Sequence, residues 1–111
     1  MMRILGFAMV SLSVVGPGLA WADAGQEAQG QQVYAHWCEP CHGDGPNFPG
    51  TTALRAKYEG KIEPVLARRG DLTADFIKVN VRKGVSVMPF FRKTEISDPD
   101  LEALAAYLSR H

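Results

Sequence analysis

Apolar residues recur at helical spacing in three stretches of the chain, and the last of these is the most regular. Ser97 or Asp98 is placed to cap a helix there, and Pro99 suits its first turn. This predicted helix carries one apolar stripe, made of Leu101, Leu104, Ala105 and Leu108. Such a stripe is typical of an amphipathic helix that packs on the rest of the molecule.

Two further helices are predicted upstream. The first runs from about Ala24 to Trp37, and the second runs from about Thr73 to Lys83. The second has Thr73 or Asp71 as its N-cap and Gly84 just past its end. Its apolar positions include Phe76, Ile77 and Val81. Glycines and prolines crowd residues 43–50, which predicts a loop, and the whole pattern favours one all-α domain of three to five helices.

The first 22 residues have the pattern of a secretory signal peptide. Arg3 precedes a largely apolar run, and Ala20 and Ala22 are small residues of the kind that a signal peptidase reads. An uncleaved membrane anchor is the alternative, but the apolar run is interrupted and falls short of the roughly 20 residues that a spanning helix needs. We therefore expect residues 1–22 to be cleaved and residues 23–111 to form an exported domain without membrane insertion.

The charge of this domain limits its possible partners, and its length limits how large a core it can bury. Cleavage would remove Arg3 and leave 89 of 111 residues, with 11 Lys and Arg against 12 Asp and Glu. A formal charge of −1 gives no case for nucleic acid as a partner. A chain of this length is also marginal at burying a core of its own, so a bound apolar group would help it fold.

The strongest chemical signal is the stretch Cys38-Glu39-Pro40-Cys41-His42. A Cys-x-x-Cys pair followed directly by histidine is the attachment motif of a c-type haem. The thiols of Cys38 and Cys41 add to the two vinyl groups of the porphyrin, and His42 reaches the iron as an axial ligand. The motif predicts one covalently bound haem c, and this chemistry agrees with export to the periplasm.

Two other uses of a Cys-x-x-Cys pair compete with haem attachment. A thioredoxin-like redox site expects a strand–helix–strand context, and a structural zinc site expects four clustered ligands. The remaining histidines, His36 and His111, provide no second ligand pair at the usual spacing.

Met88 is the candidate for the second axial ligand, because the other methionines lie in the predicted signal peptide. Pro89 follows it and restricts its backbone to an extended or turn conformation that can hold the thioether toward iron. A lone methionine more often fills a gap in a core. Here the haem motif upstream favours a ligand, and His36 lies too close to Cys38 to compete.

Together these residues resemble a class I cytochrome c. The haem motif lies near the N-terminus, Gly30 and Tyr34 precede it, Met88-Pro89 follows a helix, and an amphipathic helix closes the chain. More narrowly, residues 65–108 resemble the cytochrome subunit of flavoprotein dehydrogenases of the 4-cresol dehydrogenase (p-cresol methylhydroxylase) type. The motifs of this narrower resemblance are Leu66-x-x-Arg69, Phe76-Ile77, Val81-Arg82-x-Gly84, Met88-Pro89 and Phe91.

The resemblance implies roles for further residues. The first and last helices are expected to cross at Gly30 and Tyr34 against Leu104, Tyr107 and Leu108. A loop carbonyl, that of Pro49 first and of Pro46 second, is expected to accept a hydrogen bond from His42 and orient its ring. Arg69 is the expected partner of a haem propionate, with Arg55 and Lys57 as further candidates.

These predictions describe a periplasmic electron carrier, not an enzyme. With His42 and Met88 on both axial positions, the iron would have no open site for a substrate. The resemblance implies an FAD-dependent dehydrogenase as electron donor and the respiratory chain as destination. A general cytochrome c that serves a terminal oxidase or reductase is the alternative, and a haem enzyme or sensor would need an exchangeable sixth ligand.

Two kinds of partner contact stay open. The basic residues Lys83, Arg92 and Lys93 flank Met88 and would steer a transient encounter with an acidic partner. Alternatively, an apolar surface would bind a permanent flavoprotein subunit, and its residues would be Val87, Pro89, Phe90 and Phe91.

Overall fold

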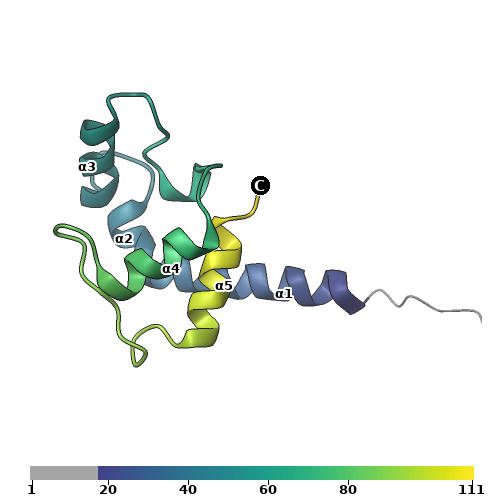
Figure 1. Ribbon diagram of the computed structural model, residues 1–111. Coiled ribbons are helices and arrows are strands. Elements are labelled where there is room, and N and C mark those ends of the chain that lie inside the picture. Colours follow the sequence, from purple (N-terminus) through teal and green to yellow (C-terminus); the bar gives the residue numbers. More distant parts are fainter. Residues whose placement is uncertain (1–17) are drawn as a thin grey trace, which may run out of the picture.

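The computed structural model of this chain describes residues 18–111, with side chains from Asp23 onward. Its helices are α1 (Gly18–Val33), α2 (Glu39–His42), α3 (Pro49–Tyr58), α4 (Ala74–Lys83) and α5 (Asp98–Leu108) (Figure 1). A π-helical turn, η1 (Tyr34–Cys38), joins α1 to α2, and a short 3₁₀ turn, η2 (Leu66–Arg68), precedes α4. In this range the one pairing of strand type is an isolated bridge between Val85 and Met88. The predicted all-α fold class is confirmed.

The predicted signal peptide lies mostly outside the described residues, which begin at Gly18. Residues 18–22, its predicted C-terminal end, form the first part of α1. No helix between residues 18 and 111 is long and apolar enough to cross a membrane. Cleavage after residue 22 therefore stays a prediction.

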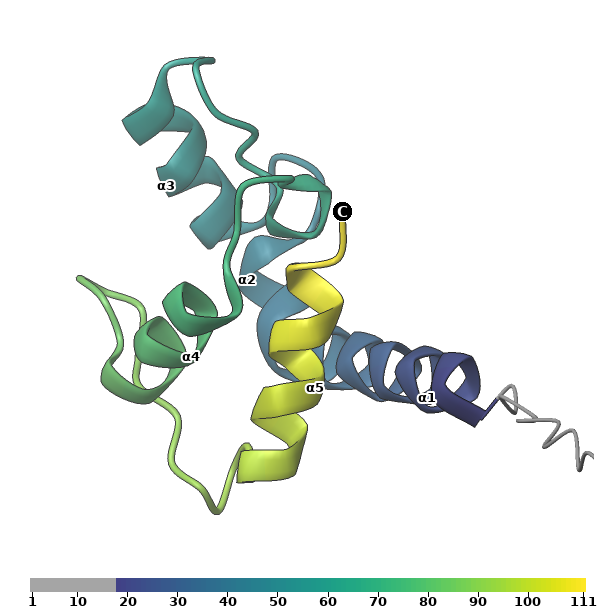
Figure 2. The same ribbon diagram turned by 45° about the vertical axis from the view of Figure 1, so that its right-hand side comes forward.

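The centre of the fold is the crossing of α1 and α5 (Figure 2). A Cβ atom at Gly30 would lie 2.0 Å from the carbonyl oxygen of Ala103 and 2.7 Å from Cβ of Tyr107. Glycine is therefore required at this position. Beside it the rings of Tyr34 and Tyr107 pack with their centroids 5.7 Å apart. The predicted crossing is confirmed, with the Ala103 backbone as the nearest neighbour of Gly30.

Both α4 and α5 begin as predicted. The Ser97 hydroxyl accepts a hydrogen bond from the Asp100 amide, and the Thr73 hydroxyl accepts one from the Phe76 amide. Gly84 ends α4 with a φ of 69°, a conformation that favours glycine. The apolar stripe of α5 and two residues of α4 form much of the core; they are Ile77, Val81, Leu101, Leu104, Ala105 and Leu108.

The apolar pattern misses α3. Pro49 stands in its first turn, but the glycines and prolines before it indicate a loop, and most of its outer positions are exposed. Its inward side is formed by Thr51, Leu54 and Tyr58, which are spaced three and four residues apart. That spacing is the signal that identifies the helix.

Substitution of Gly30 by Ala tests the helix crossing. The added Cβ must displace the Ala103 backbone, so we expect the free energy of unfolding to fall by about 3 kcal/mol, the upper part of the usual range for overpacking. Guanidinium denaturation of the purified protein measures the change. Gly25→Ala is the matched control in the same helix, because nothing lies within 4 Å of a Cβ there. Equal stability of the two variants would contradict the close crossing.

Candidate functional site

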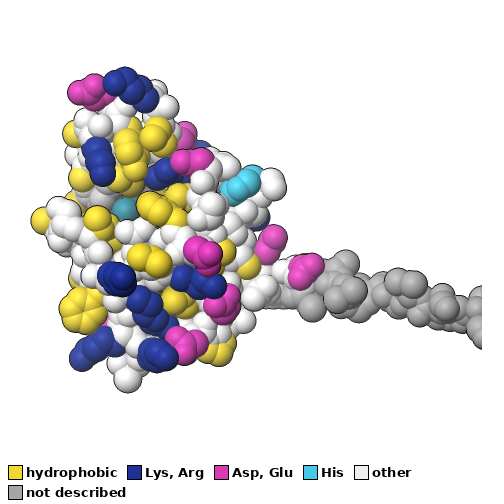
Figure 3. Space-filling model, in the orientation of Figure 1, with side chains coloured by type: hydrophobic (Ala, Val, Ile, Leu, Met, Phe, Trp, Pro, Cys, Tyr) yellow, Lys and Arg dark blue, Asp and Glu magenta, His cyan; other side chains and the backbone are white. Residues whose placement is uncertain are grey.

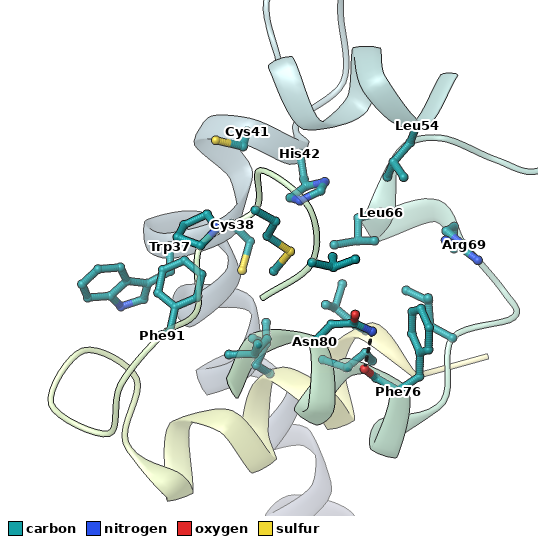
Figure 4. A pocket seen from close by; sticks show the side chains of 18 of the residues that line it. Trp37, Cys38, Cys41, His42, Leu54, Leu66, Arg69, Phe76, Asn80 and Phe91 are labelled. Atoms are coloured by element: carbon teal, nitrogen blue, oxygen red, sulfur yellow. Dashed lines mark hydrogen bonds between the residues drawn. The ribbon is translucent and has the colours of Figure 1, made fainter. Parts of the chain in front are cut away.

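Five of the six predicted site residues, all but Pro49, line one cavity of about 320 Å³ (Figure 4). Its volume lies within the range of about 300–1,000 Å³ that is usual for cofactor sites. In the close-up, Cys38, Cys41 and His42 lie on the segment opposite Phe76 and Arg69. All helices except α1 contribute to its mostly apolar lining, which includes Trp37, Leu54, Tyr58, Leu66, Leu72, Ile77, Val81, Met88, Phe91, Leu104 and Leu108.

The two cysteines are presented by η1 and α2. The Glu39 amide donates to the Tyr34 carbonyl, which widens the last turn of the predicted first helix into a π-helical turn. Single π-helical turns of this kind are frequent at functional sites. Cys38 is buried at the end of this turn, Cys41 is exposed in α2, and both are free thiols. Burial raises the pKa of Cys38 to about 12.

The imidazole of His42 is half-buried, and its Nδ1 atom is fully buried without a hydrogen bond to any described residue. Burial lowers the pKa of His42, which favours the neutral imidazole that binds metals. Gly50 packs against this ring, because a Cβ there would lie 2.8 Å from Cε1 and 2.9 Å from Nδ1 of His42.

The expected hydrogen bond from His42 to Pro49 is not formed, and none is formed to Pro46. Pro49 lies in the first turn of α3, where backbone carbonyls point along the helix toward its C-terminus. The Pro46 carbonyl instead accepts a hydrogen bond of 3.4 Å from the Thr52 hydroxyl.

Met88 enters the cavity lining from a tight turn after α4. The Val85 amide donates to the Met88 carbonyl at 3.2 Å, and the Met88 amide donates to the Val85 carbonyl at 2.9 Å. Ser86 within this turn has a φ of 54°, which is uncommon for a residue other than glycine. Gly84 is required beside it, because a Cβ there would lie 2.7 Å from the Met88 carbonyl oxygen. Two specific backbone conformations thus hold Met88 in place.

Arg69 lines the cavity, and its side chain is 8% exposed. Its Nε and Nη2 atoms donate to the two carboxylate oxygens of Asp71 at 2.8 and 2.6 Å, and Nη1 donates to the Tyr58 hydroxyl at 3.3 Å. The hydrogen bonds with Asp71 raise the pKa of Arg69 and lower the pKa of Asp71. The guanidinium fork expected to bind a propionate therefore already has a carboxylate partner. Of the other candidates, Lys57 lines the cavity and Arg55 does not.

This donor set suits a c-type haem. Two free thiols, a neutral imidazole and a thioether surround one apolar cavity, and these are the groups that attach and ligate such a haem. The described residues contain no cluster of three or more His, Cys, Asp or Glu side chains that would hold a metal ion, as a zinc site requires.

Comparison with known proteins agrees with this geometry. The family described as cytochrome C oxidase, cbb3-type, subunit III, matches residues 25–108. The chain belongs to the cytochrome c family. This cytochrome is also 32% identical over 108 residues to a Pseudomonas putida protein named 4-cresol dehydrogenase (hydroxylating) cytochrome c subunit, covering 97% of this chain and 81% of the relative. No solved structure matches the chain.

Membership of the family implies a covalently bound haem c with iron, as predicted, and it supports electron transfer as the general function. The structure gives Tyr34, expected only at the helix crossing, a second contact, because its hydroxyl donates to the His42 carbonyl. It also adds three residues of the unpredicted helix α3: Thr51, which contacts the backbone beside His42, and Leu54 and Tyr58, which line the cavity.

Loss of both thiols tests how far the fold depends on the haem. At about 24 cal/mol per Å³, an empty cavity of about 320 Å³ costs up to roughly 8 kcal/mol. This cost is comparable to the total stability of about 5–15 kcal/mol of a typical domain. We therefore expect Cys38→Ser with Cys41→Ser to yield little folded protein, as measured by the recovered yield and by circular dichroism. A stable apo-domain that unfolds cooperatively would contradict this expectation.

Proposed function

We propose that this cytochrome is a periplasmic one-electron carrier whose haem c is attached through Cys38 and Cys41 and ligated by His42 and Met88. The observation that carries the proposal is that all four side chains line a single apolar cavity. The bound haem supplies a ferrous–ferric couple. Met88 and the apolar lining both favour the ferrous form, the first as a thioether ligand and the second by disfavouring added charge, and together they raise the reduction potential.

The side chains of the cytochrome also determine what it does not do. In this proposal His42 and Met88 would occupy both axial positions, so no substrate would bind at the iron. An electron carrier is therefore favoured over an enzyme or a sensor. The turn that holds Met88 has two backbone hydrogen bonds and a required glycine, which oppose release of the ligand. Export as a cleaved precursor is supported by the pattern of residues 1–22.

Met88→Ala tests the proposed ligand set. The variant retains the attachment residues but loses the sixth ligand, so we expect covalently bound haem and avid carbon monoxide binding in the reduced state. Absorption spectroscopy under carbon monoxide measures this. Met88→His is the control, since it supplies another ligand and should exclude carbon monoxide while lowering the reduction potential. Equally avid binding by the unmodified protein would contradict the carrier proposal.

We further propose that the electron donor is a flavoprotein dehydrogenase of the 4-cresol dehydrogenase type. Support comes from the relative, which is named as the cytochrome c subunit of such an enzyme. The second candidate function is that of a general cytochrome c, which delivers electrons to a terminal oxidase or reductase. The match to a family described as an oxidase subunit supports this candidate. The chemistry of the surface around Met88 distinguishes these two candidate functions.

Beside the Met88 turn lie exposed apolar side chains that are not part of the cavity proposed to hold the haem. Val87 is 95% exposed and Phe90 is 60% exposed, and neither residue lines the cavity. Exposed large apolar side chains only three residues apart in the chain are candidates for an interaction site. Figure 3 shows hydrophobic and basic side chains gathered on the same lower part of one face.

Two of the three basic residues near this apolar surface form ion pairs within the chain, so they are less available to attract a partner than the sequence suggests. Arg92 pairs with Glu95 at 2.7 Å, and Lys93 pairs with Asp98 at 3.0 Å. Within residues 18–111, Lys83 forms no ion pair. Ion pairing weakens the attraction of Arg92 and Lys93 for a distant acidic partner, which favours apolar contact with a bound flavoprotein subunit over charge-steered encounters.

The docking surface is tested with purified flavoprotein of the 4-cresol dehydrogenase type. We expect Phe90→Asp to abolish co-purification and slow haem reduction at least tenfold, because it places a charge in an apolar contact. Lys83→Glu should change the rate less than threefold across a salt series. Ile62→Asp is the control, an exposed apolar residue between α3 and η2. A strong salt dependence that Lys83→Glu removes, with Phe90→Asp unaffected, would instead favour the transient carrier.

A further inference from the structure

Two consecutive backbone carbonyls beside the predicted iron ligand each accept a hydrogen bond from a buried side-chain hydroxyl. The Tyr34 hydroxyl donates to the His42 carbonyl at 3.0 Å, and the Thr51 hydroxyl donates to the Gly43 carbonyl at 2.7 Å. Tyr34 is 5% exposed and Thr51 is fully buried. The two donors come from different elements, η1 and α3, which lie on either side of the loop that follows His42.

This arrangement fixes the backbone that carries the imidazole. A carbonyl held on each of two successive peptide planes leaves Gly43 little freedom to rotate, and it sets the backbone direction at His42. Gly50 then limits the ring itself, because the space that a Cβ would take at this position is bordered by Cε1 and Nδ1 of His42. Buried Nδ1 has no hydrogen bond in the described range, so these backbone contacts take the part usually played by a partner of that nitrogen.

The Tyr34 hydroxyl is suited to a permanent hydrogen bond. This hydroxyl lies 3.0 Å from the His42 carbonyl and the residue is 5% exposed, so water has little access to compete for this hydrogen bond. Its ring is held in turn by Tyr107 of α5 at a centroid distance of 5.7 Å. The central helix crossing is thus connected directly to the ligand loop.

We infer that Tyr34 is a positioning residue for the axial ligand, and that its hydroxyl, together with that of Thr51, orients the His42 imidazole and tunes the reduction potential. The inference rests on the proposed function, because it concerns the ligand set of the electron carrier. Loss of the Tyr34 hydroxyl removes a positive hydrogen from beside the ligand. This change favours the ferric form.

The test is Tyr34→Phe in the intact haem-loaded protein. We expect the equilibrium to shift three- to tenfold toward the ferric form, where tenfold corresponds to about 59 mV for one electron. Potentiometric titration measures this shift, and proton NMR of the ferric protein reports changed paramagnetic shifts of the His42 ring. Tyr107→Phe is the matched control, because its hydroxyl donates no hydrogen bond within residues 18–111. A Tyr34→Phe protein that matches Tyr107→Phe in potential and ring shifts would overturn the inference.

A second pair of variants covers the case in which Tyr34→Phe does not mature. Thr51→Val removes the other hydroxyl, and Thr51→Ser retains it, so only the valine variant should lower the potential. Equal potentials for the two would also overturn the inference. These failures are distinct from failure of the proposed function, which would appear as an unmodified protein that carries no haem or that binds carbon monoxide avidly.

Discussion

The close approach of α1 to the Ala103 backbone is the contact on which the rest of the structure depends. Because Gly30 lacks a side chain, α5 lies directly on α1, and Tyr34 at the start of η1 packs against Tyr107. That contact fixes the start of η1, which places Cys38 and then His42 at the cavity. Helix α5 also supplies Leu104 and Leu108 to the cavity lining, so the same helix crossing positions this part of the lining.

The cavity proposed to hold the haem adjoins the hydrophobic core. The cavity is bordered by buried residues of α4 and α5, so a covalent haem c there would complete the packing as well as carry the electron. This dual role explains how a predicted domain of 89 residues can be stable, since short chains bury little apolar surface by themselves. It also explains why a tightly constrained turn, with φ of 54° at Ser86, is tolerated beside Met88.

The sequence predicts the elements whose signals are local, and it misses those that depend on tertiary contacts. The caps at Thr73 and Ser97 and the stripe of α5 are confirmed because each follows from neighbours in the chain. By contrast, α3 is held by a few inward residues facing a cavity, and the π-helical turn depends on how α1 meets α5. Motif chemistry singles out the four residues proposed to attach and ligate the haem, and these line one cavity, whereas the Asp71 partner of Arg69 and the hydroxyl contacts beside His42 appear only in three dimensions.

The most direct test of the central claim is a proton NMR spectrum of the reduced, unmodified protein. In diamagnetic ferrous haem with two strong axial ligands, an iron-bound methionine lies over the porphyrin, and the ring current moves its methyl resonance far upfield. We predict one such three-proton resonance, and isotope labelling of methionine should assign it to Met88. A paramagnetic, high-spin ferrous spectrum without that resonance would contradict ligation by His42 and Met88.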